Sequence, residues 1–184
     1  MPSPKFTLTL EQLHALHAGE QRVFKLIFDE FQPRLYRFLW LKLRHVQHAE
    51  DMVQETFFRL WKARQQLRAE TRLAIYLFRI AANLATDFFR RAKLNTASLE
   101  SVTRTLPAPN ALEATIEHQQ LAHAVAEILA TLPDGPRTAF ALSRYEDLTY
   151  AEIAEVMGLS IKTVEKHLGK ALLLVREGLK ERGW

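Results

Sequence analysis

Apolar residues recur every three or four positions along most of this chain. Between Glu20 and Lys93 they form three stripes, each spaced to lie on one face of an α-helix. The stripes are Val23, Phe24, Ile27, Phe28, Phe31, Leu35, Phe38 and Leu39; then Val53, Phe57, Leu60 and Trp61; then Leu77, Ile80, Ala81, Leu84 and Phe88. The last two predict helices over about 49–64 and about 74–91. Because no useful stretch alternates as a strand does, the pattern predicts an all-α fold.

The periodic pattern stops at residues 94–110, which are short, polar and contain two prolines. This composition is typical of a flexible linker, and about 20 extended residues span roughly 60–70 Å. Helical spacing resumes from Leu112, followed by a predicted turn at 133–136 and a short helix at 138–145. We therefore predict two small helical domains: an N-terminal extension at 1–19, a domain at 20–93, a linker at 94–111 and a second domain at 112–184.

The second domain contains the signals of a helix-turn-helix. Thr149 and Glu152 form a T-x-x-E capping box, Gly158 supplies a left-handed turn, and Ser160 is placed to cap the next helix. Ala154 is small where the second helix must cross the first. The residues expected to face inward are Tyr150, Ile153, Ala154 and Met157 in the first helix, and Val164, Leu168, Ala171, Leu172 and Val175 in the second.

The other face of the second helix carries lysines at every fourth position, Lys162, Lys166 and Lys170. Lysines neutralise phosphates or reach guanine edges, and a threonine can contact a base or a phosphate. The predicted DNA-binding residues here are Ser160, Lys162, Thr163, Lys166, His167 and Lys170. The alternative is a helical hairpin with a merely solvated lysine face.

Charge is distributed unevenly along the 184 residues, whose net charge is +4. Residues 1–94 hold 16 Lys and Arg against 9 Asp and Glu, whereas residues 95–184 hold 9 against 12. A basic first half suits a polyanionic partner, and the lysine stripe provides a positive face in the acidic second half. The absence of cysteine excludes disulfides and favours a cytoplasmic setting. No apolar run is long enough to span a membrane, and residues 1–10 do not resemble a signal peptide.

Two segments, AEDMVQETFFRLWKAR (49–64) and LFRIAANLATDFFRR (77–91), resemble the N-terminal domain of extracytoplasmic-function (ECF) sigma factors of the sigma-70 family. The segment LTYAEIAEVMGLSIKTVEKHLGKAL (148–172) resembles their C-terminal domain. The resemblance covers roughly residues 20–180, and two motifs in the right order are more specific than either alone. It implies a factor that binds core RNA polymerase and promoter DNA and directs promoter recognition and melting.

The resemblance also implies roles for particular residues. The helix bearing Asp51, Gln54 and Glu55 would dock on the clamp coiled coil of the polymerase, a role suited to an acidic, polar patch on a basic domain. The segment from Gln65 to Arg72 and the helix after it would open and hold the minus-ten element. In that helix Asn83 and Asp87 would read a base edge, while Arg90 and Arg91 would hold phosphates. A basic helix end that complements the helix dipole is the alternative for these two arginines. The second domain would read the minus-thirty-five element.

The string TVEKH followed by AL (163–167 and 171–172) resembles the iron-responsive, FecI-like branch, which implies control by a membrane-bound anti-sigma factor. Only Glu100 and Arg104 are charged within residues 95–110, so the linker departs from the acidic pattern that would mimic RNA. Two alternatives stay open: a stand-alone helix-turn-helix regulator with an N-terminal dimerisation or sensing module, and a helical adaptor that binds only protein. We expect no catalysis, cofactor, metal or small-molecule substrate, because no phosphate loop or nucleophile turn is present and the pairs His14/His17 and His45/His48 lack a nearby third ligand.

Overall fold

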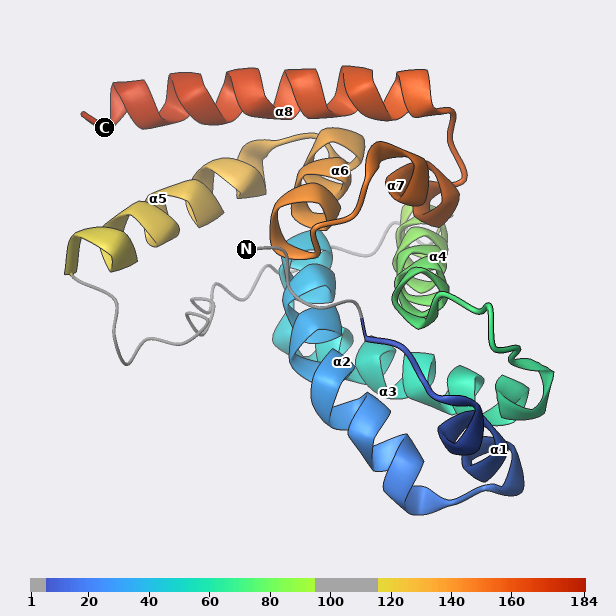
Figure 1. Ribbon diagram of the computed structural model, residues 1–184. Helices are drawn as coiled ribbons and strands as arrows, with labels where there is room; N and C mark the ends of the chain where they lie inside the picture. Colours follow the sequence, from blue (N-terminus) through green and yellow to red (C-terminus); the bar gives the residue numbers. More distant parts are fainter. Residues whose placement is uncertain (1–5, 95–115) are drawn as a thin grey trace.

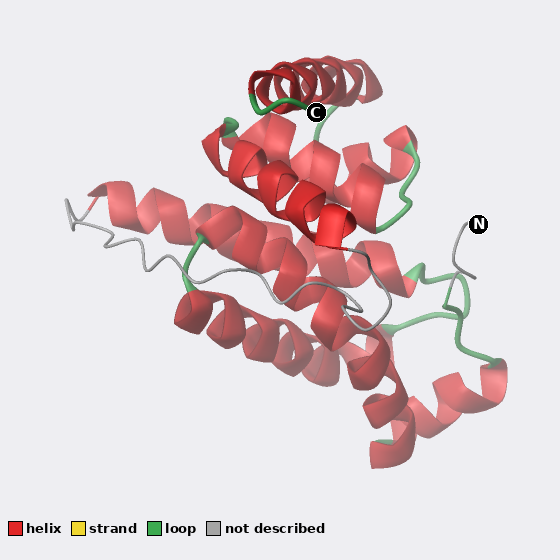
Figure 2. Ribbon diagram, turned by 90° about the vertical axis from the view of Figure 1, so that its left-hand side faces the viewer, coloured by secondary structure: helices red, strands yellow, loops and turns green. Residues whose placement is uncertain are grey.

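The computed structural model describes residues 6–94 and 116–184, and all regular elements within these ranges are helices (Figures 1 and 2). The predicted all-α fold is confirmed. The first part of the chain contains α1 (Leu10–Ala18), α2 (Gln21–Leu43), α3 (Val46–Ala63), the short 3-10 helix η1 (Arg64–Gln66) and α4 (Leu73–Leu94). The second contains α5 (Ile116–Thr131), α6 (Asp134–Tyr145), α7 (Tyr150–Met157) and α8 (Ile161–Glu181). Residues 95–115, which include most of the predicted linker at 94–111 and the predicted start of the second domain at 112, lie outside the described ranges.

Helices α2, α3 and α4 pack together, as the three apolar stripes predict. Phe31, Leu60 and Leu77 are fully buried between them. The residues predicted to be a mere extension also contribute to this packing. Leu13 and Leu16 of α1 are buried, and α1 lies against α2 and η1. The extension is therefore partly a structural element of the first domain.

Two prolines lie inside helices, and one of them explains a helix boundary that differs from the sequence prediction. Helix α2 continues through Pro33, which is exposed, on the side where water can satisfy the carbonyl that loses its hydrogen bond. The turn predicted at 133–136 is wrong, because α6 begins at Asp134 and contains Pro136 in its first turn. A proline is tolerated there since the first helical N–H groups have no intrahelical partner.

Helices α6, α7 and α8 pack against one another, and α5 lies along α8. The predicted inward residues Ile153, Ala154, Val164, Leu168, Ala171 and Val175 are buried. The prediction is wrong for Tyr150 and Leu172, which are exposed. Both stand at the margin of their helical stripe, where spacing alone does not distinguish core from surface.

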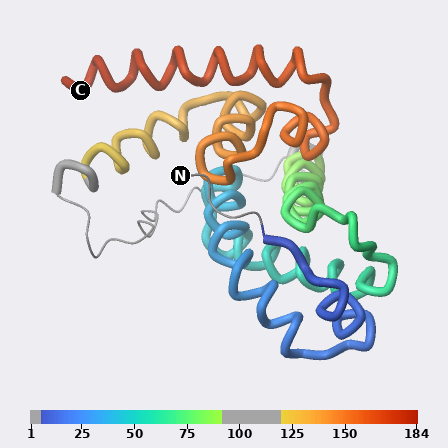
Figure 3. The backbone as a smooth tube through the Cα atoms, in the orientation of Figure 1, coloured from blue at the N-terminus to red at the C-terminus, as the bar shows by residue number. Residues whose placement is uncertain are grey.

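The two parts of the chain share one continuous hydrophobic core. The end of α2 packs against α6, and α4 packs against α7, as Figure 3 shows for the light blue and green segments below the orange ones. Trp40, Leu41, Lys42 and Leu43 are buried in succession, so the last turn of α2 is covered on all sides. A helix that is apolar on one face needs one neighbour, whereas this turn is enclosed by helices from both parts.

Candidate functional site

The helix-turn-helix forms as predicted, from local signals. The Thr149 side chain accepts a hydrogen bond from the backbone N–H of Glu152, and the Glu152 carboxylate accepts one from the N–H of Thr149 at 2.8 Å. Gly158 ends α7 in the left-handed region, with φ of 64°. The Ser160 hydroxyl then accepts from the N–H of Thr163 at 3.1 Å and begins α8. These caps fix the angle at which α8 leaves the turn.

The lysine stripe of α8 lies on the outside of the molecule. Lys162, Lys166 and Lys170 are exposed, and within the described residues none of them has a carboxylate partner within 4 Å. Figure 1 shows α8 spanning one edge of the molecule, away from α2 and α4. The three ammonium groups are therefore accessible to a polyanion.

The other predicted contacts on this helix have structural partners. Ser160 and Thr163 share a hydrogen bond between their hydroxyls at 2.8 Å. His167 is only partly exposed and packs over Gly135 at the start of α6, where an added Cβ would lie 2.7 Å from the imidazole Cε1 atom. Gly135 therefore allows α8 to approach α6 closely, and His167 is positioned by the protein itself. The sequence offers no local signal for that contact.

The predicted acidic patch occupies one face of α3. Asp51 and Gln54 are exposed and Glu55 is partly exposed. Asp51 accepts a hydrogen bond from Gln47, and Glu55 forms an ion pair with Arg59 at 2.8 Å. Both partners lie on the same helix, and within the ranges 6–94 and 116–184 no other element binds either carboxylate.

An exposed aromatic residue that sequence reasoning missed lies on the same face. Phe58 follows Gln54 by four positions and Glu55 by three, so it shares their side of α3. It is 51% exposed, and the Lys62 ammonium lies 4.2 Å from its ring centroid. A large apolar side chain surrounded by polar groups is typical of the centre of a protein-binding surface. The sequence did contain a signal for this surface, because within the segment 49–64 Phe58 lies at helical spacing from Gln54 and Glu55.

Contacts at Leu67 and at Arg72 anchor the segment from 65 to 72, and most of its other residues are polar. Leu67 is buried, and its carbonyl oxygen lies 3.0 Å from the Nε2 atom of His17 on α1. The N–H of Arg68 donates to the Thr71 hydroxyl at 3.0 Å. Arg72 forms ion pairs with Glu155 and Glu152 of α7, the latter at 3.6 Å. Around these anchors, Gln65, Gln66, Arg68 and Glu70 are exposed.

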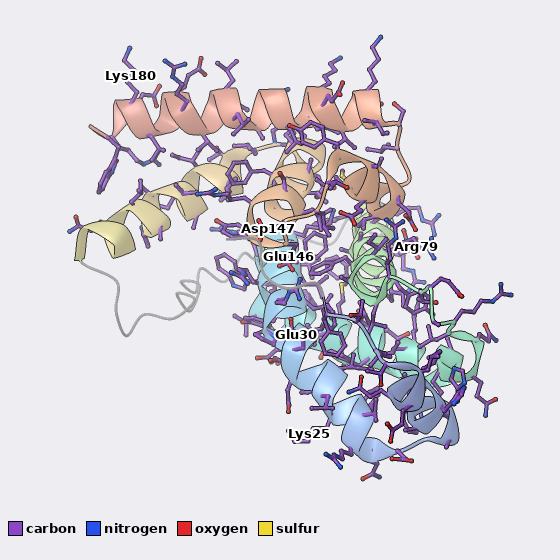
Figure 4. All side chains as sticks on the ribbon, viewed as in Figure 1. Lys25, Glu30, Arg79, Glu146, Asp147 and Lys180 are labelled. Atoms are coloured by element: carbon purple, nitrogen blue, oxygen red, sulfur yellow. The ribbon has the colours of Figure 1, made fainter. Side chains whose placement is uncertain are left out.

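The polar side of α4 presents most of its predicted residues to solvent. Asn83, Arg90 and Arg91 are exposed and Asp87 is partly exposed; Arg79, labelled in Figure 4, is exposed as well. Asp87 forms an ion pair with Arg90 at 3.1 Å. The α4 and α8 residues lie on different helices of the two parts of the chain, so the structure assembles two separate surfaces.

Both histidine pairs include residues with structural partners in the protein. His45 is the N-cap of α3, where its Nδ1 atom accepts from the N–H of His48, and the two rings stack with centroids 4.1 Å apart. His17 holds the Leu67 carbonyl. No group of three or more His, Cys, Asp or Glu placed to hold a metal is found among the described residues. No helix in the described part of the chain is long and apolar enough to cross a membrane.

Family models match both parts of the chain. One, described as sigma-70 region 2, matches residues 27–94, and another, described as sigma-70, region 4, matches residues 122–175. The ferric citrate uptake sigma factor FecI of Escherichia coli (strain K12) is 32% identical over 170 residues, 90% of this chain and 88% of that protein. The ECF RNA polymerase sigma factor SigW of Bacillus subtilis (strain 168) is 25% identical over 180 residues, 93% of this chain and 96% of that protein.

Solved structures share the fold. CnrH in complex with the cytosolic domain of CnrY matches with a TM-score of 0.67 and 24% identity, over 92% of this chain and 96% of that one. RpoE in complex with the anti-sigma factor NepR from Bartonella quintana matches with a TM-score of 0.70 and 22% identity, over 85% of this chain and 96% of that one.

The matches to sigma-70 regions over both parts of the chain, together with the helix-turn-helix and its exposed cationic helix, identify a transcription initiation factor. The chain belongs to the sigma-70 family, in its extracytoplasmic-function group. It is therefore not an enzyme, and the predicted family is confirmed.

Proposed function

We propose that this sigma factor docks on core RNA polymerase through α3, captures the minus-ten element with residues 65–72 and α4, and reads the minus-thirty-five element with α8. The observation that carries the proposal is the lysine stripe: Lys162, Lys166 and Lys170 are exposed and have no carboxylate partner among the described residues. Lysine side chains that form no ion pair within the protein remain available to bind phosphates and base edges of duplex DNA. The division into domains at 20–93 and 112–184, with α1 added to the first, belongs to the same proposal.

The polymerase-binding surface that we propose consists of Asp51, Gln54 and Glu55 with Phe58 at its centre. The carboxylates complement a basic partner, and Phe58 adds an apolar anchor that loses water on binding. A coiled coil that presents basic residues beside an apolar side chain would be complementary to this surface.

For the minus-ten element, we propose that the exposed polar side chains around the buried Leu67 contact an unstacked base and that Asn83 and Asp87 on α4 contact its edge; their exposure supports this. Arg90 and Arg91 then hold the strand by its phosphates. The ion pair between Arg90 and Asp87 must open for Asp87 to accept a hydrogen bond from a base.

An anti-sigma factor is part of the proposal, supported by the structural relatives CnrH and RpoE, which were solved with CnrY and the anti-sigma factor NepR. The match to FecI and the TVEKH string support the iron-responsive branch and a membrane-bound regulator acting on a cytoplasmic sigma factor. Transcription from promoters of this factor should then respond to iron supply in cells. Promoters that are indifferent to iron would contradict the branch while leaving the sigma function intact.

The decisive experiment is transcription in vitro with core polymerase on a promoter library. The full chain should direct initiation at a defined set of templates, and core enzyme alone should not. A stand-alone regulator or a protein-only adaptor would give no such transcripts.

The docking surface is tested with Asp51→Lys/Glu55→Lys, which reverses the patch and should weaken polymerase binding at least tenfold. The matched control is Glu177→Lys/Glu181→Lys, the same charge change at the same spacing on the exposed side of α8. Polymerase affinity should be unchanged in this control when it is measured without DNA. Equal affinity of the two variants would refute the docking assignment.

A further inference from the structure

Helix α1, dark blue in Figure 1, lies against η1 and makes a polar contact with the segment 65–72. The Nε2 atom of His17 lies 3.0 Å from the carbonyl oxygen of Leu67. A carbonyl oxygen only accepts, so the imidazole donates in this bond. Within the described residues no backbone N–H donates to this carbonyl, and Leu67 is 6% exposed. His17 therefore satisfies a main-chain acceptor that secondary structure leaves open, and the loss of such a partner is costly.

Other hydrogen bonds of this segment are local. The N–H of Leu67 donates to the carbonyl of Arg64 in η1 at 3.3 Å. The N–H of Arg68 donates to the Thr71 hydroxyl, and the N–H of Thr71 donates to the Arg68 carbonyl, each at 3.0 Å. These bonds shape a turn but do not attach it to another element. The hydrogen bond from His17 fixes the main chain of the turn to a helix 50 residues away in the sequence.

Helix α1 is itself fixed at both ends. At its start the Thr9 hydroxyl accepts from the N–H of Gln12 at 3.2 Å, and the Gln12 side chain accepts from the N–H of Thr9 at 2.9 Å. At its end Gly19 has a φ of 86°, and its N–H donates to the Leu16 carbonyl at 3.0 Å. Leu16 is fully buried. His17 therefore projects from a helix that is held by its caps and by the core.

The backbone at Leu67 determines which side chains of the segment face solvent. Leu67 is extended, with φ of −67° and ψ of 141°, and successive side chains of an extended chain point in opposite directions. Because the Leu67 side chain is buried, its neighbours Gln66 and Arg68 face outward, and both are exposed. They are among the side chains that the proposed function assigns to an unstacked base. Such a site must be preorganised, because a displacement of about 1 Å can cost about 100-fold in rate.

We propose that His17 is a positioning residue for capture of the minus-ten element: its hydrogen bond to the Leu67 carbonyl holds Gln66 and Arg68 where they meet an unstacked base. The inference rests on the proposed function of residues 65–72. His17 acts through Leu67 and not through α3 or α8, so polymerase docking and duplex recognition do not depend on it. Helix α1, predicted as a mere extension, then contributes to promoter specificity.

The test compares His17→Leu and His17→Gln in the full chain bound to core polymerase. Leucine removes the donor and keeps an apolar side chain, whereas glutamine restores an N–H donor. The probe is a short single-stranded DNA that carries the minus-ten sequence selected by the wild-type chain, so its binding requires no melting. We expect His17→Leu to weaken this binding by about tenfold or more, where tenfold corresponds to about 1.4 kcal/mol. His17→Gln should recover most of the loss, and a glutamine variant no better than the leucine variant would overturn the role of the hydrogen bond.

Base preference distinguishes positioning from a general loss of stability. Each base is placed in turn at the minus-ten position where the wild-type chain discriminates most strongly. The ratio of affinities between the best and the worst base should fall several-fold in His17→Leu, while the affinity for core polymerase stays that of the wild type. A variant that is merely less stable weakens on all sequences by one factor, so an unchanged ratio would overturn the positioning role.

His14→Leu is the matched control. His14 is exposed on the same helix, and the same substitution there leaves the bond between His17 and the Leu67 carbonyl in place. Strand binding and base preference of this control should equal those of the wild type. Urea unfolding checks that each variant is folded. Should His17→Leu not fold, His17→Phe, which keeps a ring without a donor, repeats the comparison with the same expected loss.

Gln66→Ala and Arg68→Ala distinguish this inference from the function on which it rests. Both variants should weaken binding of the single strand, because they remove side chains assigned to the base. Weakening in these two variants without any in His17→Leu would leave the proposed function intact and overturn the role of His17. No effect in any of the three would refute the assignment of residues 65–72 to the minus-ten element, and the inference with it.

Discussion

Two sets of cations in this molecule occupy opposite environments. Lys42 on α2 is buried and bound by Asp134 and Thr138, whereas Lys162, Lys166 and Lys170 on α8 are exposed, with no carboxylate partner among the described residues. A buried charge is costly unless it is paired, so it fixes one internal geometry. An exposed, unpaired charge adds little to stability and stays available to an outside polyanion. Burial and pairing together therefore distinguish a lysine that holds the fold from one that binds a partner.

The largest effect is expected when the three exposed lysines of α8 are removed together. Lys162→Ala/Lys166→Ala/Lys170→Ala should weaken binding of a minus-thirty-five duplex by about 3 kcal/mol or more, over 100-fold, because three phosphate or base contacts are lost. The slope of log affinity against log salt should fall by about 3. The free energy of unfolding should change by less than about 0.5 kcal/mol per site, since the side chains are exposed. Fluorescence anisotropy over a salt series and urea unfolding measure the two quantities. Unchanged DNA affinity would remove α8 from the DNA-binding surface.

The next largest effect is expected when the buried Lys42 loses its counter-ion. Asp134→Ala leaves the Lys42 ammonium buried without its counter-ion and should lower the free energy of unfolding by about 2–3 kcal/mol. This lies below the roughly 3–5 kcal/mol typical of a broken buried pair, because Asp134 is half exposed. Asp29→Ala, which breaks the exposed pair with Lys25, should cost less than about 0.5 kcal/mol. Equal midpoints for the two variants in urea would show that burial of Lys42 does not matter.

A single lysine sharpens the assignment on α8. Lys166→Ala should cost about 1–3 kcal/mol of DNA affinity if Lys166 reads a base edge, and base preference should relax at one position. A uniform loss across all sequences would identify a phosphate contact instead. Selection of bound sequences from a randomised duplex distinguishes the two outcomes.

The local features of both surfaces could be predicted from the sequence. Thr149, Gly158 and Ser160 act within four residues of their own positions, so their hydrogen bonds follow from short-range spacing. Asp51, Gln54 and the lysine stripe are exposed because helical periodicity alone places them opposite the apolar residues. The three apolar residues around Lys42, namely Trp40, Leu41 and Leu43, were a signal as well, since apolar residues on most sides of a helix turn indicate burial there.

Contacts between distant segments could not be predicted in this way. Lys42 and Asp134 are 92 residues apart, and nothing in the spacing of either helix pairs the two side chains. The same holds for His167 over Gly135 and for His17 at the Leu67 carbonyl, which depend on how helices pack and not on spacing within one helix. Such contacts decide which of the predicted polar residues are free: His167 is engaged over Gly135, whereas the three lysines have no ion-pair partner among the described residues.

The smallest expected effect tests whether position at the interface is enough to make an ion pair important. Arg72 binds Glu155 across the two parts of the chain, as Lys42 binds Asp134, but Arg72 is 56% exposed and Glu155 is 41% exposed. Glu155→Gln should therefore change the free energy of unfolding by less than about 1 kcal/mol, because water and salt screen the pair. Glu152 remains within 3.6 Å of Arg72 and keeps its place in the α7 capping box, so helix α7 stays intact. A loss of 2 kcal/mol or more in urea would mean that exposed pairs also hold the two parts together, and the contrast between buried and exposed cations would then fail.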